Sequence, residues 1–383
     1  MKIGVDVRVL MDKQYSGISK YLAHLLAEIL RLDKDNEYRL FYNSFKDISG
    51  RMKTWKRGNA ELIATRYPNK VFNYFLQKMF CCPKLDRVLG GVDVFWSPHF
   101  NFSSISVGAK KIITVHDLSF LRYPEFFSAR KNFWHKCLKV KKAIREADAV
   151  IAVSQNTKND IVELVGIGEE KVRVIYSGNN AKKISLDDED RKKFDEKFRL
   201  EKPFILYLGN IEPRKNIANL IKAYNELRNQ GREYKDWQLI LAGAPAWKNK
   251  KIFSQWNKSD YKESIRFLGY IDDVEKEILY EKAGLFVYPS FYEGFGFPPL
   301  EAMSRAVPVI CSNTSSLPEV VGGGALTINP FKVEEITDAM KLVIKDGKFR
   351  ERLVVSGKSR SEDFSWQKTA EEYLKLFKEI CEQ

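Results

Sequence analysis

The sequence lacks the features that mark membrane-spanning, secreted and zinc-binding proteins. None of its apolar runs approaches the roughly 20 residues that a helix needs to cross a bilayer. The N-terminal residues 1–7 predict a strand and not a signal peptide. The five cysteines show neither zinc-site nor redox spacing, and two of them, Cys81 and Cys82, are adjacent. These absences predict a reduced, cytoplasmic globular protein.

Positive charge is in excess, with 64 Lys and Arg against 50 Asp and Glu and a net charge of +14. Such a surplus favours polyanionic partners: nucleic acid, an anionic membrane or a phosphorylated substrate. Cations alternate with aromatic residues in two segments of the N-terminal half, 51–87 and 126–145, and the second contains seven cations and no carboxylate. Segments of this kind suit an anionic membrane surface, and a solvated basic face with buried aromatics is the alternative. We expect a protein held peripherally at the inner face of the plasma membrane.

The length and the periodicity of the chain predict two domains. A chain of 383 residues is long for a single core. Strands and helices alternate along it, which predicts parallel sheets covered by helices. The predicted strands are residues 3–10, 92–96, 111–115, 149–153, 172–176, 204–208, 238–242, 265–268, 285–288 and 307–311. A charged run at 182–199 lacks apolar periodicity, so we place the domains at 1–180 and 200–363 and a final helix at 364–383.

The most informative segment is residues 290–303, in which Glu293 and Glu301 stand eight residues apart. Two glycines and two prolines separate them, which is typical of a loop that leads into a helix. The amide groups and the dipole at such a helix N-terminus form a site for phosphate. Ionised carboxylates on either side would accept hydrogen bonds from hydroxyl groups. The pattern therefore predicts a site for a nucleoside diphosphate sugar, with ribose on one side of the pyrophosphate and hexose on the other.

Polar residues follow several predicted strands in both halves of the chain. They are Ser16 with Gly17, His116 with Asp117, Ser154, Asn210, Tyr270 and Glu293. In open α/β sheets ligands bind outside the carboxyl ends of the strands, so a ligand held between the two sheet edges would explain the arrangement. The alternative is that loops in general carry polar residues. Ser154 is most simply an N-cap of the helix that follows it, and we leave it out of the site.

Each of these residues has a functional and a structural interpretation. Lys215 and Arg214 could neutralise a pyrophosphate leaving group, or they could be ordinary surface cations. Gly17 could admit a phosphate close to a helix N-terminus, or it could form a tight turn. His116 and the adjacent Asp117 could touch the substrate, or the histidine could be structural.

These residues resemble the retaining family-4 glycosyltransferases of GT-B fold over nearly the whole chain. The resemblance is carried by the segments 16–18, 115–120, 208–216, 293–302 and 317–321. The amino-acid sequences of segments 4–8, 116–124 and 212–216 are most similar to those of the bacterial O-antigen mannosyltransferase branch. The resemblance implies an α/β fold of two Rossmann-like domains that face each other across a cleft. It places the acceptor side in the first domain and nucleotide-sugar binding in the second, and the C-terminal helix crosses back to the first domain.

The same resemblance implies a role for individual residues. Glu293 would lie beside the donor sugar, and Glu301 would hold the ribose hydroxyls. The other implied donor-binding positions are Gly17, Asn210, Tyr270, Ile271, Gly294, Phe295, Gly296, Phe297 and Leu300. The implied catalytic residues are Glu293, His116, Lys215 and Arg214, and the acceptor-side residues are His116 and Asp117. Many relatives have arginine where this chain has Asn210, and Arg214 is expected to supply that charge.

The implied activity is transfer of a hexose, mannose from GDP-mannose in the first place, onto a lipid-linked or oligosaccharide acceptor. The setting would be bacterial cell-surface polysaccharide synthesis. No cofactor or metal ion is expected, because Lys215, Arg214 and the helix N-terminus supply positive charge; the acidic run 187–190 is interpreted as a solvated face. UDP-glucose and UDP-N-acetylglucosamine are the competing donors. Two different classes of protein also compete with a transferase: a basic nucleic-acid-binding protein, which the lack of a nucleic-acid module disfavours, and a non-catalytic sugar-nucleotide-binding protein.

Overall fold

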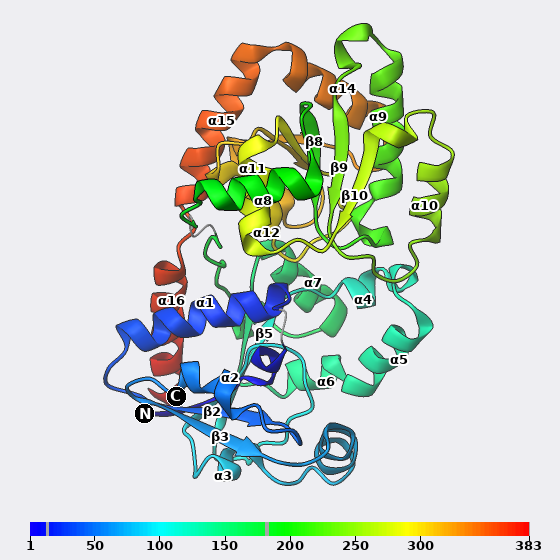
Figure 1. Cartoon of the computed structure of the whole chain (residues 1–383). Helices are drawn as coiled ribbons and strands as arrows, with labels where there is room; N and C mark the ends of the chain where they lie inside the picture. The colour runs from blue at the N-terminus through cyan, green and yellow to red at the C-terminus, as the bar shows by residue number, and fades with distance from the viewer. Residues whose placement is uncertain (13–14, 181–183, 383) are drawn as a thin grey trace. The chain divides into compact units, whose positions relative to one another are not determined.

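The chain divides into two compact α/β units (Figure 1). The computed structural model describes residues 1–12, 15–180 and 184–382. The first unit comprises Met1–Arg122, Arg130–Gly178 and Ser365–Gln383, and the second comprises Tyr123–Ala129 and Asn179–Phe364. Each unit is built on one parallel sheet covered by helices. The predicted α/β fold class is thus confirmed.

The first unit contains a seven-stranded parallel sheet in the order β3-β2-β1-β4-β5-β6-β7. Its strands are β1 (Lys2–Asp6), β2 (Glu37–Asn43), β3 (Ala60–Thr65), β4 (Val94–Ser97), β5 (Lys110–Val115), β6 (Ala149–Ala152) and β7 (Val172–Val174). In the interior strand β1, Ile3 pairs with Tyr38 of β2 on one side and with Val94 of β4 on the other. Its apolar residues are buried, as expected for a parallel strand covered on both faces.

Helices cover this sheet. They are α1 (Gly17–Leu32), α2 (Ser49–Met52), α3 (Leu85–Val88), α4 (Ser119–Arg122), α5 (Ala129–Leu138), α6 (Val140–Arg145), α7 (Gln155–Val165) and α16 (Trp366–Glu382), with the π-helical segment η3 (Val71–Met79). The shorter 3-10 turns of this unit are η1 (Arg8–Met11), η2 (Lys53–Trp55) and η5 (Glu169–Lys171), whereas η4 (Pro124–Phe126) belongs to the second unit. Helix α16 packs beside α1 (Figure 1), where the Tyr21 and Tyr373 hydroxyls are 2.6 Å apart. The C-terminal helix therefore belongs to the first unit, as predicted.

The second unit contains a six-stranded parallel sheet in the order β10-β9-β8-β11-β12-β13. Its strands are β8 (Phe204–Leu208), β9 (Gln238–Ala242), β10 (Ile265–Gly269), β11 (Leu285–Tyr288), β12 (Val309–Ser312) and β13 (Leu326–Ile328). Its helices are α8 (Asp188–Phe198), α9 (Ile217–Asn229), α10 (Lys250–Asn257), α11 (Asp273–Lys282), α12 (Phe297–Ser304), α13 (Leu317–Val321), α14 (Val333–Lys345) and α15 (Gly347–Glu362). The 3-10 turns are η6 (Pro213–Lys215), η7 (Arg232–Tyr234), η8 (Lys262–Ser264) and η9 (Gly322–Gly324).

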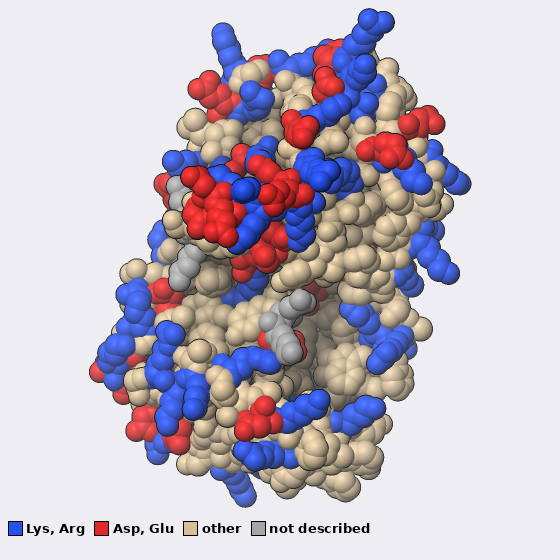
Figure 2. All heavy atoms as spheres, viewed as in Figure 1, with Lys and Arg blue, Asp and Glu red and all other residues tan. Residues whose placement is uncertain are grey.

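The acidic run 187–190 begins α8. Asp187 accepts a hydrogen bond from the Asp190 amide, and the two residues form a capping box. Figure 2 shows acidic side chains gathered over this part of the second unit. Within the described residues, no His, Cys, Asp and Glu side chains form a group of three or more suited to a metal ion. Nor does any described helix combine the length and the apolar character needed to cross a membrane.

Candidate functional site

Glu293 lies in the loop between β11 and α12 and forms ion pairs with two cations. Its Oε1 accepts a hydrogen bond from Lys215 Nζ at 2.6 Å, and its Oε2 accepts one from Arg214 Nη1 at 2.9 Å. Lys215 and Arg214 lie in η6, just beyond the carboxyl end of β8. Because β8 and β11 are neighbours in the sheet, residues 78 or 79 positions apart in the chain meet at one edge.

A second carboxylate, Glu212, completes the cluster. Glu212 is buried, and its Oε1 accepts hydrogen bonds from Arg214 Nε at 3.2 Å and Nη2 at 2.9 Å. Lys215 Nζ also donates to the Tyr288 hydroxyl at 2.6 Å. The cluster thus holds two cations and two carboxylates, and its formal charges balance. Glu212 was not among the site residues predicted from the sequence. The available signal was a carboxylate two residues before an arginine, with the intervening Pro213 starting a turn.

The charges fix the ionisation of Glu293. Burial alone would raise the pKa of this carboxyl, but the charges of Arg214 and Lys215 outweigh burial and lower the pKa to about 2. Burial lowers the pKa of Lys215, and repulsion by Arg214 adds to that effect, while Glu293 opposes it. Glu293 is therefore an ionised carboxylate at neutral pH, able to accept hydrogen bonds from hydroxyl groups.

Hydrogen bonds hold the loop that carries Glu293. The Glu293 amide donates to Ser315 Oγ at 2.9 Å, and Ser316 Oγ donates to the carbonyl oxygens of Glu293 at 3.0 Å and Phe295 at 2.8 Å. Gly296, at the N-cap of α12, has φ +113°, and a Cβ there would come within 2.6 Å of Leu317 Cδ2. Only glycine fits this position. The loop is therefore a fixed entry into α12.

The second glutamate of the motif, Glu301, lies one turn into α12 and is also buried and paired. Its Oε2 accepts from Lys276 Nζ at 3.1 Å and from the Tyr280 hydroxyl at 3.3 Å, both from α11. The sequence analysis did not assign Lys276 or Tyr280 to the site. The side chain of Leu300 is fully buried. The implied role of Leu300 in donor binding stays a prediction.

Three further donor-side positions, Asn210, Tyr270 and Ile271, lie at strand ends of the same sheet. Asn210 follows β8, and its carbonyl accepts a hydrogen bond from the Tyr207 hydroxyl at 3.1 Å. Tyr270 and Ile271 follow β10, which is separated from β11 by two strands, and Tyr270 is 56% exposed. An exposed aromatic ring at a sheet edge can stack on a nucleobase. Tyr270 and Ile271 thus lie on the same sheet edge as Glu293, but they are two strands away from the cluster that Glu293 forms with Lys215 and Arg214.

Two glycines bring the ends of β8 and β9 into backbone contact. Gly209 has φ +152° and Gly243 has φ +146°. A Cβ on Gly243 would lie 2.0 Å from the Gly209 carbonyl oxygen. A side chain at position 243 is therefore excluded by sterics and by backbone conformation together. The sequence analysis did not single out Gly243.

In the first unit, His116 follows β5 and is held in one orientation. Its Nε2 lies 2.8 Å from the Pro98 carbonyl oxygen, so Nε2 carries the proton and donates it, and Nδ1 is the acceptor nitrogen. The ring meets Tyr21 edge-on at 4.7 Å between centroids. Burial lowers the pKa of His116 to about 4. The imidazole is therefore neutral near pH 7.

Asp117 has a structural partner. Its Oδ1 accepts hydrogen bonds from the amide of Ser119 at 2.9 Å and from its hydroxyl at 2.6 Å. Asp117 thus forms an Asx turn that leads into α4, a common structural role of aspartate. The predicted acceptor contact of Asp117 stays a prediction.

Gly17 is the first residue of α1. Ser16 caps the helix, with its Oγ accepting from the Ser19 amide at 3.3 Å. A Cβ built on Gly17 meets nothing within 4 Å, and the residue is exposed. Packing therefore does not require glycine at this position. Because Gly17 has no side chain, the surface over the first turn of this 16-residue helix is open.

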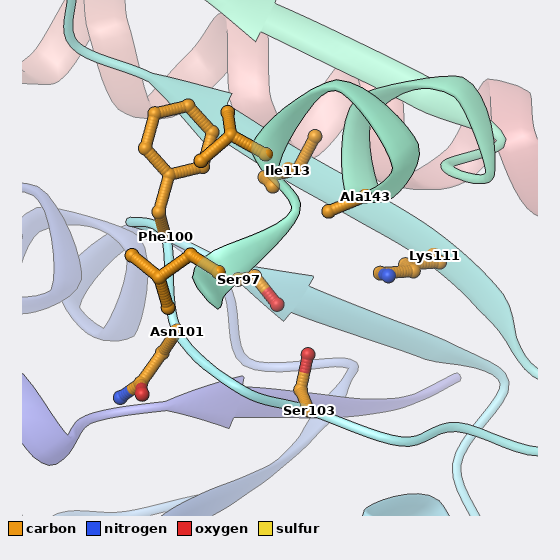
Figure 3. A pocket seen from close by; sticks show the side chains of 9 residues that line it. Ser97, Phe100, Asn101, Ser103, Lys111, Ile113 and Ala143 are labelled. Atoms are coloured by element: carbon orange, nitrogen blue, oxygen red, sulfur yellow. The ribbon is translucent and has the colours of Figure 1, made fainter. Parts of the chain in front are cut away.

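A small cavity in the first unit is separate from these residues (Figure 3). Its volume of about 10 Å³ holds about one water molecule, which is too small for a sugar nucleotide. It is lined by Ser97, Phe100, Asn101, Ser103, Lys111, Ile113, Leu138, Val140 and Ala143. Burial lowers the pKa of Lys111. The cavity lies beside β5, which contributes Lys111 and Ile113 to its lining.

Comparisons with known proteins agree with this architecture. The Glycosyltransferase Family 4 model matches residues 15–183, and the model for glycosyl transferases group 1 matches residues 188–360. The chain is 32% identical over 271 residues to O-antigen chain mannosyltransferase B of Escherichia coli, covering 70% of each protein. It is 31% identical over 283 residues to the serotype-specific mannosyltransferase WbdA of E. coli, covering 72% of this chain and 35% of that longer protein.

Solved structures show the same fold. Sucrose-phosphate synthase from Thermosynechococcus elongatus superposes with a TM-score of 0.73 at 20% identity, and 99% of each chain is covered. HepE from Anabaena, solved in complex with UDP and glucose, gives 0.73 at 18% identity, again with 99% of each chain covered. The two parallel-sheet units are thus those of a GT-B glycosyltransferase. The chain belongs to the family-4 glycosyltransferases.

Proposed function

We propose that the protein transfers mannose from GDP-mannose to a saccharide acceptor with retention of the anomeric configuration. Similarity to the E. coli O-antigen mannosyltransferases supports the sugar. The observation that carries the proposal is the ionised Glu293 carboxylate, held between Lys215 and Arg214 at the edge of the second sheet. Such a carboxylate suits the hydroxyl groups of a hexose.

In this proposal, donor binding changes the hydrogen-bond partners of Glu293, Lys215 and Arg214. Without a donor, Glu293 neutralises Lys215 and Arg214. When the sugar hydroxyls donate hydrogen bonds to Glu293, the two cations turn their N–H groups to the diphosphate. The amides at the start of α12 add positive potential on the same side. The leaving group is neutralised by these groups, so the proposal requires no metal ion and no further cofactor.

The chemical step in this proposal is a front-face substitution. The acceptor oxygen forms a bond to the anomeric carbon on the face from which the phosphate oxygen departs. The acceptor proton passes to the departing phosphate, and GDP leaves. The protein contributes by positioning both substrates and by stabilising the developing charge. His116, neutral with Nδ1 as an acceptor, orients the reacting sugar or acceptor hydroxyl.

The acceptor in this proposal is a glycan linked to an isoprenoid pyrophosphate. The reaction would belong to bacterial cell-surface polysaccharide synthesis, which is the class of process in which the similar E. coli enzymes are named. The protein would work in the cytoplasm at the inner face of the plasma membrane. The first unit would hold the acceptor, because the acceptor-side residues His116 and Asp117 lie on it, and the second unit would hold most of the donor.

A panel of nucleotides and sugar nucleotides tests the donor. We expect GDP and GDP-mannose to raise the melting temperature more than UDP, ADP or their sugars do. Proton NMR of the product formed from GDP-mannose should then show the donor's α configuration. Stabilisation by UDP-glucose or UDP-N-acetylglucosamine alone would favour those two donors over GDP-mannose. Salt-sensitive DNA binding, with no effect of any sugar nucleotide on melting, would favour a nucleic-acid-binding protein.

Replacing Gly17 with alanine is expected to lower transfer about tenfold without harming the fold. Alanine is the better helix former, so the free energy of unfolding should stay equal or rise by up to about 1 kcal/mol. The added Cβ occupies the open space through which a phosphate would approach the backbone. The matched control is Gly50→Ala in α2, where a Cβ also meets nothing within 4 Å. Equal kcat/KM in both variants would remove Gly17 from the proposed site.

A further inference from the structure

One face of η3 presents large apolar side chains to solvent. The segment runs as a π-helix, with the Phe80 amide bonded to the Phe75 carbonyl five residues back. Its exposed residues, together with the one that follows it, are Val71, Tyr74, Phe75, Met79 and Phe80, and we call them the η3 face. Phe75 is 48% exposed and Phe80 is 64% exposed. Contiguous exposed apolar groups of this size mark a surface that meets another body.

The opposite side of η3 is anchored in the first unit, so the η3 face is held outward. Phe72 is fully buried in a cluster with Phe41. Gln77 Nε2 donates to the Pro83 carbonyl at 2.9 Å, and Gln77 Oε1 accepts from the Ser104 amide at 2.7 Å. The apolar face is therefore fixed by the fold.

Positive charge surrounds the η3 face. Residues 62–85 contain no Asp or Glu, and their cations are Arg66, Lys70, Lys78 and Lys84. Lys78 Nζ lies 4.5 Å from the centre of the Tyr74 ring. The next carboxylate along the chain, Asp86, is buried and accepts a hydrogen bond from the Ser106 amide. Asp86 is thus directed inward. Of the four cations, Arg66 also interacts with the exposed Asp47.

Helix α5 adds a second exposed aromatic pair close by. Phe133 is 67% exposed and Trp134 is 46% exposed. The Trp134 ring packs on Phe102 at 5.3 Å between centroids, and the Phe102 carbonyl accepts from Arg8 Nη2 at 2.8 Å. Arg8 Nη1 in turn donates to Asn73 of η3 at 3.0 Å. A short chain of contacts thus connects the α5 pair with the η3 face on one region of the first unit.

We propose that the η3 face, with Phe133 and Trp134 of α5, docks the first unit onto an anionic lipid bilayer. Aromatic and aliphatic side chains enter the headgroup region, while the flanking cations stay at the phosphates. The charge pattern fits this partner, because cations without carboxylates complement an anionic surface. Arg8 and Asn43 connect this region to the carboxyl ends of β1 and β2, the sheet edge on which His116 lies.

The inference deepens the proposed function and rests on it in one respect: a lipid-linked acceptor would lie in the same bilayer. The docking itself can be measured without any sugar nucleotide. The intact protein is floated with vesicles of phosphatidylglycerol and phosphatidylcholine, and with vesicles of phosphatidylcholine alone. We expect binding to the anionic vesicles that weakens as salt is raised.

Two pairs of variants localise the contact. Phe75→Ser with Phe80→Ser should weaken binding to anionic vesicles at least about tenfold, whereas Phe331→Ser with Val355→Ser should leave it unchanged. Phe331 and Val355 are 63% and 65% exposed and lie in the second unit. Lys70→Glu with Lys78→Glu should also weaken binding about tenfold or more. Lys222→Glu with Lys250→Glu, which makes the same charge change beside α10, is the matched control.

Several outcomes would overturn the docking. The first is that the wild-type protein does not bind anionic vesicles. The second is that both double lysine variants lose vesicle binding equally, and the third is that Phe75→Ser with Phe80→Ser binds as the wild type does. Self-association that this serine pair abolishes, without vesicle binding, would show that a second copy covers the surface. Transfer from GDP-mannose to a short water-soluble acceptor separates the two proposals. Vesicle binding without such transfer would leave the docking intact and contradict the proposed function.

Discussion

Replacing Glu293 with glutamine is expected to lower kcat/KM for mannosyl transfer by about 10²–10³-fold. The amide keeps the size of the side chain but removes the negative charge that sugar hydroxyls would meet. It also removes the counter-charge of Lys215 and Arg214, which contact the two carboxylate oxygens. Initial rates with GDP-mannose and a saccharide acceptor measure the effect. The matched control is Glu263→Gln, an exposed glutamate of the same unit.

The same variant tests the electrostatics of the cluster. Arg214 keeps its ion pair with Glu212, but Lys215 loses the Glu293 carboxylate. Breaking a buried ion pair in this way costs about 3–5 kcal/mol, so Glu293→Gln should unfold at a lower temperature. The pKa of Glu293 in the folded protein is about 2 against an ordinary value of 4.5. Its stabilising contribution is therefore present above pH 4.5 and is lost as the pH falls toward 2. Acid unfolding of the variant should be less steep in that window. A folded variant with wild-type transfer would show that Glu293 is outside the active site.

Replacing Lys215 with methionine is expected to lower kcat/KM by about 10²-fold or more, because the departing diphosphate loses a cation. Lys215 Nζ is held at 2.6 Å by both the Tyr288 hydroxyl and Glu293. A planar guanidinium cannot reproduce this point contact in a buried position, so Lys215→Arg should rescue little of the activity.

The effect on diphosphate binding distinguishes this role from a structural one. GDP should raise the melting temperature of the wild-type protein and of Lys222→Met, an exposed lysine on α9, but hardly that of Lys215→Met. Methionine fills the space of the lysine stem, which limits the loss of packing. Equal stabilisation by GDP in all three proteins would argue that Lys215 serves the fold and not the donor.

Local sequence pattern was sufficient for strands buried on both faces. The predicted bounds of β8, β9 and β11 coincide with the observed strands, because each is an apolar run with abrupt polar ends. The first strand was predicted to run to residue 10 but ends at Asp6. The chain turns there, and the Arg8 guanidinium returns to pair with the Asp6 carboxylate at 2.6 Å. This ion pair favours a turn over continuation of the strand. It leaves no periodic pattern in the sequence, so the end of the strand could not be predicted from hydrophobic periodicity.

The strands of the outer part of the first sheet were missed. β2 and β3 mix charged and apolar residues, and β3 is an edge strand with several partly exposed positions. Their pairing with each other and with β1 fixes them as strands. That pairing is a long-range property. The same reason applies to β13, which has three residues and is defined by its pairing with β12.

The members of the candidate site could be named from the sequence, but their partners could not. Arg214, Lys215 and Glu293 were each singled out, with the cations directed to a phosphate. In the structure, Arg214 and Lys215 both form ion pairs with Glu293, and Arg214 also pairs with Glu212. Those pairings follow from the adjacency of β8 and β11 and from the turn at Pro213. Neither is visible as a local pattern.

The close approach of β8 and β9 limits how this enzyme can be re-engineered. Gly243 leaves no volume for a side chain against the Gly209 carbonyl, so saturation libraries at either glycine would return misfolded protein. Tyr270 is half exposed at the neighbouring strand end and can change without disturbing the core. The resemblance implies that Tyr270 and Ile271 bind the donor, so directed evolution of donor preference under the proposed function should randomise these two positions and keep both glycines fixed.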